Sequence, residues 1–231
     1  MARRPRPVLL APGAPLGFPD PEESDAEGLL AVGGDLTPER LLVAYGNGIF
    51  PWYAEGLPPM WWSPDPRAVV DPSSLHVSKS LARELRNARF TVTFDRAFKD
   101  VMLECGRERE GGTWILPEMV DAYLRLHELG HARSFEVWFG ARLVGGLYGV
   151  QRGALFAAES MFHRETNASK VALVAAVRTL FGAGIELFDV QFTTPHLASM
   201  GVYDLPRPAY LARVRAAADR SVALDGVTIS L

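Results

Sequence analysis

The stretch GIELFDVQF, residues 184–192, has the composition of a β-strand because it combines β-branched and aromatic residues. Side chains of a strand alternate between two faces, so Ile185 and Leu187 should share a face with Asp189 and Gln191. That face begins apolar and ends in a carboxylate and a carboxamide. The plainer interpretation is a strand end that meets water, and the alternative is the floor of a pocket.

The segments before this strand predict an α+β domain with a mostly antiparallel sheet. Residues 134–139, 142–150 and 154–162 alternate like strands and are joined by short glycine-containing turns, which indicates a meander. A helix is predicted over 171–181 before the strand at 184–192. Because a crossover helix brings the next strand in parallel, we expect one parallel pair and a gap or splay in the sheet.

Residues 1–75 differ in composition from the rest of the chain, since they contain 13 of the 17 prolines. We therefore expect a small, loop-rich N-terminal domain over 1–75 and a second, larger domain over 76–231. Trp52, Trp61 and Trp62 lie in the first of these. Such rings pack in cores and at domain interfaces, and the alternative is a flat wall on which a base stacks.

Composition excludes several classes of protein. Cys105 is the single cysteine, so an internal disulfide and a multi-cysteine metal site are excluded, and a small buried hydrophobe is the expected role. No uninterrupted apolar run reaches the length of a membrane span, and the N-terminus lacks the apolar core of a secretory signal, which predicts a cytoplasmic protein. The net charge of −3 means that any polyanion would need a local basic patch.

One such patch is predicted on a helix over 78–88, where Lys79, Arg83 and Arg86 share a face. The stripe is either a solvated helix surface or a phosphate-binding surface. Further along, the charged, glycine-containing loop 107–113 precedes Trp114 and suits a mobile wall.

Two carboxylates interrupt apolar rows on neighbouring strands, Glu159 in the meander and Asp189 in the opening stretch. A carboxylate that faces a core is costly unless it is paired or hydrogen-bonded. It is either a structural ion pair or part of an acidic pocket for a cationic ligand. The candidate structural partners are Arg164, Lys170 and Arg178.

Nucleophile-elbow, Walker, zinc-protease and dinucleotide-binding motifs are absent from the sequence. The predicted order of elements is similar to acetyltransferases of the GNAT type. Their glycine-rich pyrophosphate loop should open the helix after the meander, and here that place reads ETNASK, residues 165–170, which disfavours acetyl-CoA.

Eight motifs in family order and spacing closely resemble the leucyl/phenylalanyl-tRNA–protein transferases of bacteria, over roughly residues 18–210. The motifs are GGDL (33–36), GIFPW (48–52), WWSPDPR (61–67), GTW (112–114), LHELGH (126–131), ESMF (159–162), NASK (167–170) and DVQ (189–191). One departure is Ala158, where the family has glycine and where a methyl group could narrow the pocket.

The resemblance implies a GNAT-like catalytic domain behind a smaller N-terminal domain. It implies transfer of Leu or Phe, and less readily Met, from aminoacyl-tRNA to the N-terminal Arg or Lys of a protein, which is thereby marked for degradation. No metal and no small cofactor is implied.

The resemblance also implies roles for individual residues. Asp189 would accept a proton or orient the reacting amine, Gln191 would donate hydrogen bonds, and Glu159 would contact a cationic group or a sugar hydroxyl. The transferred side chain would enter an apolar pocket, although alternation turns Phe156 away from Met161. The proposed lining is Leu147, Phe156 and Met161.

The same resemblance places the tRNA. Trp52 and Trp114 would flank the terminal adenosine, with Tyr45 and Tyr123 nearby. The basic stripe of Lys79, Arg83 and Arg86 would hold acceptor-stem phosphates. Two alternatives remain open: an aminoacyltransferase of the peptidoglycan cross-bridge type, and a non-catalytic binder of the tRNA acceptor stem.

Overall fold

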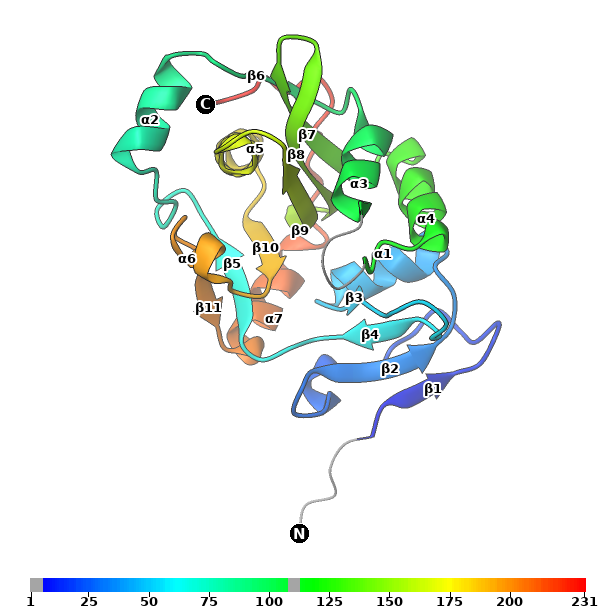
Figure 1. Cartoon of the computed structure of the whole chain (residues 1–231). Coiled ribbons are helices and arrows are strands. Elements are labelled where there is room, and N and C mark those ends of the chain that lie inside the picture. Colours follow the sequence, from blue (N-terminus) through cyan, green and yellow to red (C-terminus); the bar gives the residue numbers. More distant parts are fainter. Residues whose placement is uncertain (1–5, 108–112) are drawn as a thin grey trace.

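A computed structural model describes residues 6–107 and 113–231, whose strands form two sheets (Figure 1). The smaller sheet has the strand order β1-β2-β4-β3. Its strands are β1 (Val8–Leu10), β2 (Leu29–Gly33), β3 (Phe50–Pro51) and β4 (Met60–Trp62). Helix α1 (Pro38–Gly46) connects β2 to β3, and its start is fixed by the Thr37 side chain, which caps it, and by the proline at its first position.

The larger sheet has seven strands in the order β11-β5-β10-β9-β8-β7-β6. They are β5 (Arg67–Val70), β6 (Thr91–Phe94), β7 (Ala132–Phe139), β8 (Arg142–Arg152), β9 (Leu155–His163), β10 (Leu187–Gln191) and β11 (Tyr203–Leu205). Every neighbouring pair is antiparallel except β9 and β10, which are parallel. The predicted meander, the parallel pair and the mostly antiparallel α+β fold are confirmed.

Helices cover both faces of the larger sheet (Figure 1). On one face α5 (Ala168–Gly182) lies in the main apolar core, and on the other α3 (Phe98–Gly106) and α4 (Pro117–Glu128) pack together with α1 and the small sheet. The remaining helices are η1 (Pro21–Glu23), α2 (Lys79–Arg86), α6 (Pro195–Ala198) and α7 (Arg207–Ala217). Cys105 is buried in α3, as predicted.

The division of the chain at residue 75 remains a prediction. Strand β5 lies before that point but pairs with β10 and β11 inside the larger sheet. Residues 63–66 therefore connect the two sheets, and one apolar cluster joins side chains of α1 and β4 with those of α3, α4 and β8.

Two irregularities shape the centre of the larger sheet. Ser160 pairs with Tyr148 and Ala158 with Gly149, so Glu159 is the extra residue of a β-bulge. The bulge reverses the alternation after it, and Met161 packs on the same apolar cluster as Phe156. The predicted divergence of Phe156 and Met161 was wrong for this reason.

The second irregularity lies in the stretch that opened the sequence. Val190 is the extra residue where β10 pairs with β5, and Gln191 follows with a φ of 60°, which few residues other than glycine adopt. A β-bulge therefore sets the direction of both polar side chains, at Glu159 itself and directly before Gln191.

The C-terminal tail, which its sequence left unassigned, packs on the main core through Leu224, Val227 and Ile229. None of the helices in the described ranges combines the length and the apolar character needed to cross a bilayer. Within those ranges, no three His, Cys, Asp or Glu side chains gather in a way that could hold a metal ion.

Candidate active site

A cavity of about 170 Å³ lies where the two sheets meet. Its lining comes from β3 and the residue after it, from Trp114, from the bulge of β9 and from the end of β10. These residues are Phe50, Pro51, Trp52, Trp114, Glu159, Gln191 and Phe192. The fold therefore brings together four of the residues predicted for the site, which are up to 139 positions apart in sequence: Trp52, Trp114, Glu159 and Gln191.

The tryptophans of the first 75 residues have different roles. Trp61 is buried in the core and Trp62 donates its indole N–H to the carbonyl of Trp52, so both support the small sheet. Trp52 is 43% exposed and its ring lies 6.0 Å from that of Phe192, which gives the cavity an aromatic wall. We call this space the tryptophan cavity.

Gln191 and Glu159 form the polar floor of the tryptophan cavity. The amide Nε2 of Gln191 donates to Glu159 Oε1 at 3.0 Å, and Tyr123 donates to Glu159 Oε2 at 3.0 Å. The hydroxyl of Tyr45 lies 2.5 Å from that of Tyr123. Both tyrosines are buried, so they hold Glu159 from behind, and neither belongs to the cavity lining.

Burial raises the pKa of Glu159 to about 7, against hydrogen bonds from Tyr45 and Tyr123 that lower it. The charge of Asp189 raises the pKa further, and that of Arg67 lowers it. Burial and the charge of Glu159 raise the pKa values of both tyrosines well above their ordinary value, so they remain hydrogen-bond donors at neutral pH. Glu159 is therefore a carboxyl group that can exchange a proton near pH 7.

Asp189 has a different environment, because it is fully buried and lies outside the lining of the tryptophan cavity. Its Oδ1 accepts from Arg67 Nε at 2.8 Å and from the Gln191 backbone N–H at 2.9 Å. Its Oδ2 accepts from Arg67 Nη2 at 2.6 Å and from the Tyr210 hydroxyl at 2.9 Å. A carboxylate with four donors has its acceptor capacity filled, so Asp189 orients its neighbours and leaves no oxygen free for a substrate proton.

The structural partner of Asp189 is Arg67, which the sequence did not single out. The candidates Arg164, Lys170 and Arg178 were wrong for Asp189, and Arg164 pairs with Glu104 instead. The sequence feature that could have identified Arg67 is its position directly before the apolar run 68–70, because the two together form a fully buried strand.

Arg67 is held from several sides. Its guanidinium lies 4.6 Å from the ring centres of both Phe50 and Tyr210 and donates to the Gly48 carbonyl at 3.0 Å. Burial favours loss of the proton, but Asp189 outweighs it and raises the pKa of Arg67, which stays charged. Since Phe50 lines the tryptophan cavity, this buried pair connects the cavity wall to the strand that carries Gln191.

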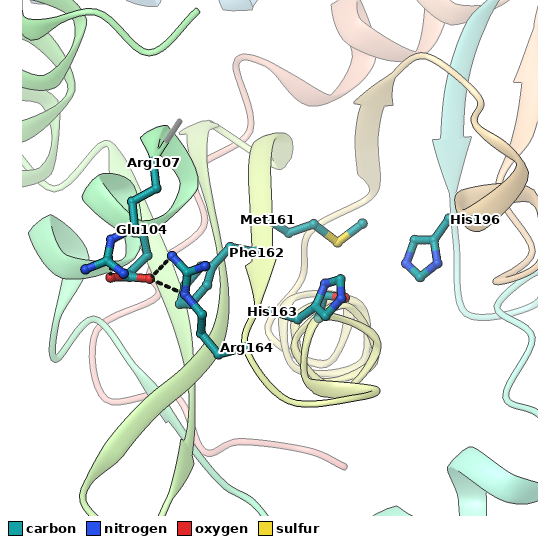
Figure 2. Close-up of a pocket in the computed structure, with 8 residues that line it drawn as sticks. Glu104, Arg107, Met161, Phe162, His163, Arg164 and His196 are labelled. Atoms are coloured by element: carbon teal, nitrogen blue, oxygen red, sulfur yellow. Dashed lines mark hydrogen bonds and ion pairs between the residues drawn. The ribbon is translucent and has the colours of Figure 1, made fainter. Parts of the chain in front are cut away.

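The predicted apolar pocket does not lie in the tryptophan cavity. Leu147 and Phe156 are buried in the main core with Ala158, and Met161 packs against them. Met161 also lines a second cavity, of about 440 Å³, at the start of α5 (Figure 2).

The basic stripe of α2 is exposed. Lys79, Arg83 and Arg86 form no ion pair with any part of the chain that the structure describes, whereas Arg89 pairs with Glu84 and Glu165. Of the predicted mobile loop 107–113, residues 108–112 lie outside the described residues.

The raised pKa of Glu159 predicts a pH-dependent effect of Glu159→Gln on stability. A carboxyl whose pKa is raised on folding contributes stability that is complete below its ordinary pKa of 4.5 and is lost as the pH rises through about 7. Relative to the unmodified protein, the variant should gain about 1 to 3 kcal/mol in free energy of unfolding between pH 5 and pH 8.5, since cavity water screens part of the burial. Urea unfolding at the two pH values measures this gain.

The matched control for that measurement is Glu55→Gln, at an exposed glutamate before β4. An equal gain in both variants would contradict the prediction.

Solved structures with a similar arrangement share little sequence with this chain. One is L-PGS from Bacillus licheniformis, with a TM-score of 0.39, 13% identity, and coverage of 73% of this chain and 57% of that one. Another is a GCN5-related N-acetyltransferase from Kribbella flavida, with a TM-score of 0.38, 11% identity, and coverage of 69% and 57%.

Sequence comparison gives much closer matches. The family described as leucyl/phenylalanyl-tRNA protein transferase matches residues 69–215, and its N-terminal domain matches residues 34–65. A leucyl/phenylalanyl-tRNA–protein transferase of Anaeromyxobacter sp. (strain Fw109-5) is 57% identical over 208 residues, which cover 89% of this chain and 88% of that protein. One of Nitratidesulfovibrio vulgaris (strain DP4) is 52% identical and covers 89% of each. The chain therefore belongs to the leucyl/phenylalanyl-tRNA–protein transferase family.

Proposed function

We propose that this chain transfers leucine or phenylalanine, and less readily methionine, from aminoacyl-tRNA to the N-terminal arginine or lysine of a protein, which marks that protein for degradation. Membership of the family supports an aminoacyltransferase that uses tRNA and a protein acceptor. The observation that carries the proposal is the tryptophan cavity, where an aromatic wall stands beside Glu159 and Gln191.

The aromatic wall suits the terminal adenosine of the tRNA. A base offers a flat π-face, and stacking on aromatic side chains is a common way to hold an unpaired nucleotide. Trp52 and Trp114 supply two rings from distant segments, with Phe192 against Trp52. The ester that joins the amino acid to the 3′ end of this adenosine would then lie near the polar floor.

The reaction needs positioning and the movement of one proton. The neutral α-amine of the acceptor attacks the ester carbonyl carbon, a C–N bond forms and the C–O bond to the ribose breaks. The proton that the amine loses ends on the released ribose oxygen. Because an α-amine has a pKa near 8, a useful fraction is neutral at pH 7, and the ester needs no further activation.

Glu159 and Gln191 divide this work. Glu159 is at the cavity surface, and its pKa of about 7 suits it to take the proton from the amine and return it to the ribose oxygen. Gln191 cannot titrate, but its amide N–H groups can donate to Glu159 and to the oxyanion that forms at the ester carbon. Asp189 is a positioning residue that fixes the Gln191 backbone and holds Arg67.

A transfer assay tests the function directly. The protein is incubated with tRNA that carries labelled Phe and with a peptide that begins with Arg, and we expect label at the peptide N-terminus. A peptide that begins with Glu is the matched acceptor control. No transfer at any enzyme concentration, despite tight tRNA binding, would leave a non-catalytic acceptor-stem binder, and preference for a lipid-linked acceptor would favour the cross-bridge class.

The basic stripe of α2 predicts a specific loss of salt sensitivity. Each cation that neutralises a tRNA phosphate releases counterions, so Lys79→Gln, Arg83→Gln and Arg86→Gln together should flatten the slope of log affinity against log salt by about 3. Arg215→Gln removes an exposed cation on α7 and is the control for a general charge effect. Filter binding of uncharged tRNA at several salt concentrations measures both slopes, and parallel slopes for the triple variant and the unmodified protein would refute the assignment.

A further inference from the structure

The second cavity is built around the first turn of α5 (Figure 2). The end of β9 forms one side, with Met161 and His163 extending toward His196 of α6. Ser169, in the first turn of α5, also lines the cavity. Its volume of about 440 Å³ exceeds the 170 Å³ of the tryptophan cavity, yet the transfer chemistry proposed above uses none of its polar groups.

Ser169 marks this cavity as a binding site. Ser169 is only 5% exposed, and the part of it that is accessible lines this cavity. No other side chain or backbone group in residues 6–107 and 113–231 shares its hydroxyl, which leaves the hydroxyl open to the cavity. A hydroxyl that faces a cavity can donate a hydrogen bond to whatever occupies that cavity. A ligand with oxygen acceptors would satisfy it.

The backbone beside Ser169 is equally open. The N-cap residue of α5, Asn167, makes no side-chain cap and instead donates to Glu84 of α2 at 2.6 Å. No acidic side chain lies in the first turn of α5, and the amides of Ser169 and Lys170 have no backbone acceptor in the described part of the chain. The positive end of a 15-residue helix therefore lies at this cavity, and Glu84, which accepts from the N-cap residue, is not part of the cavity lining.

The side chains around the cavity add positive charge. Its one carboxylate, Glu104, pairs with both Arg107 and Arg164. Burial lowers the pKa of His196, and the charges of Lys170 and His163 lower it further, so these three groups lie within electrostatic reach of one another. Two arginines against one carboxylate leave the lining with a net positive charge, and His196, whose pKa is lowered, can offer a neutral N–H to an anion.

The position of the cavity indicates which anion it would hold. Strand β9 runs from one cavity to the other, because Glu159 lines the tryptophan cavity and Met161 lines this one. On the other side, the bond from Asn167 to Glu84 joins the start of α5 to the helix that carries the basic stripe. The cavity is thus linked to the tryptophan cavity by β9 and to α2 by the bond between Asn167 and Glu84, so a nucleic-acid end that uses both of those surfaces can place a phosphate here.

We propose that the cavity at the start of α5 binds the phosphate group on the 5′ side of the terminal adenosine, through Ser169, the first-turn amides and His163 with His196. The assignment rests on the proposed function. It adds a phosphate subsite between the base-binding wall and the stem-binding helix, and it predicts that the enzyme distinguishes nucleosides from nucleotides.

The test uses two probes that differ only in this phosphate: adenosine esterified with phenylalanine at its 3′ oxygen, and the same ester with a 5′-phosphate. The phosphorylated probe should have the lower KM with the unmodified protein. Ser169→Asp places a carboxylate in the cavity at a position that favours a helix start, so it should fold. We expect it to reduce the advantage of the phosphorylated probe about tenfold, which matches the loss of one charge-assisted hydrogen bond.

Ser221→Asp is the matched control, since it adds the same charge at an exposed serine in the C-terminal segment, where it lines a different cavity. An unchanged KM ratio in Ser169→Asp, or an equal loss with both probes, overturns the subsite. If Ser169→Asp does not fold, His163→Gln with His196→Gln is judged by the same ratio. Calorimetric binding of adenosine 5′-phosphate against adenosine tests the site without turnover, so its failure is distinguishable from absence of transfer activity.

Discussion

Arg67→Met should lower the free energy of unfolding by about 3 to 5 kcal/mol, because it leaves the buried carboxylate of Asp189 without its cation. The pair is bidentate, with N–O distances of 2.8 and 2.6 Å, and both side chains are almost fully buried. The variant also loses the contacts of the guanidinium with Phe50 and Tyr210 and its bond to Gly48. Urea unfolding at pH 7 measures the loss.

A double variant separates the unpaired charge from the loss of packing. Arg67→Met with Asp189→Leu removes both charges, and it should recover much of the stability that Arg67→Met loses, since apolar side chains often replace a buried ion pair at little cost. Arg125→Met is the control, because its ion pair with Glu128 is exposed and should contribute less than about 1 kcal/mol. A loss of similar size in Arg67→Met and Arg125→Met would show that the buried pair does not stabilise this fold.

Gln191→Ala should reduce the rate of transfer about 10²- to 10³-fold, the range observed when a hydrogen-bond donor to a developing oxyanion is removed. The side chain lies at the cavity floor, 3.0 Å from Glu159, and its backbone is fixed by Asp189. Since the basic stripe and the tryptophan wall are unaffected, tRNA affinity should change little. Single-turnover transfer with saturating enzyme, alongside tRNA binding, separates the two effects.

Two variants sharpen the Gln191 result. Gln191→Asn retains an amide on a shorter side chain, so it should recover part of the rate, whereas a purely structural role would not depend on the amide. Thr193→Ala is the control, because Thr193 is exposed just beyond β10 and bonds to Asp204 outside the cavity. Transfer by Gln191→Ala within about threefold of the unmodified rate would exclude Gln191 from stabilising the transition state.

The larger features of the fold were predictable because local patterns encode them. The alternation of apolar and polar residues predicted the meander, and the helix expected over 171–181 predicted that the strands before and after it pair in parallel, as β9 and β10 do. Alternation also located Glu159 and Asp189 as polar residues on buried strands. It failed at Met161, because a bulge is set by how two strands pair and not by the composition of one of them.

The site itself depended on contacts between distant segments. Glu159 and Asp189 looked equivalent in sequence, yet one reaches the tryptophan cavity with a raised pKa and the other is enclosed by four donors. Tyr45 and Tyr123, predicted beside the adenosine, hold Glu159 from behind. Which carboxylate reaches solvent is decided by the packing of the whole core.

The sequence by itself determined the elements, their order and the family, since periodicity, turn residues and collinear motifs are properties of neighbouring residues. Only the tertiary structure decided that Arg67 pairs with Asp189 across 122 positions, and that Ser169 lies unpartnered beside a cavity. A buried charge selects its partner by the desolvation it avoids in the folded core, and a cavity exists only between packed surfaces. Neither the partner of a buried charge nor the presence of a cavity can be recognised from a local stretch of sequence.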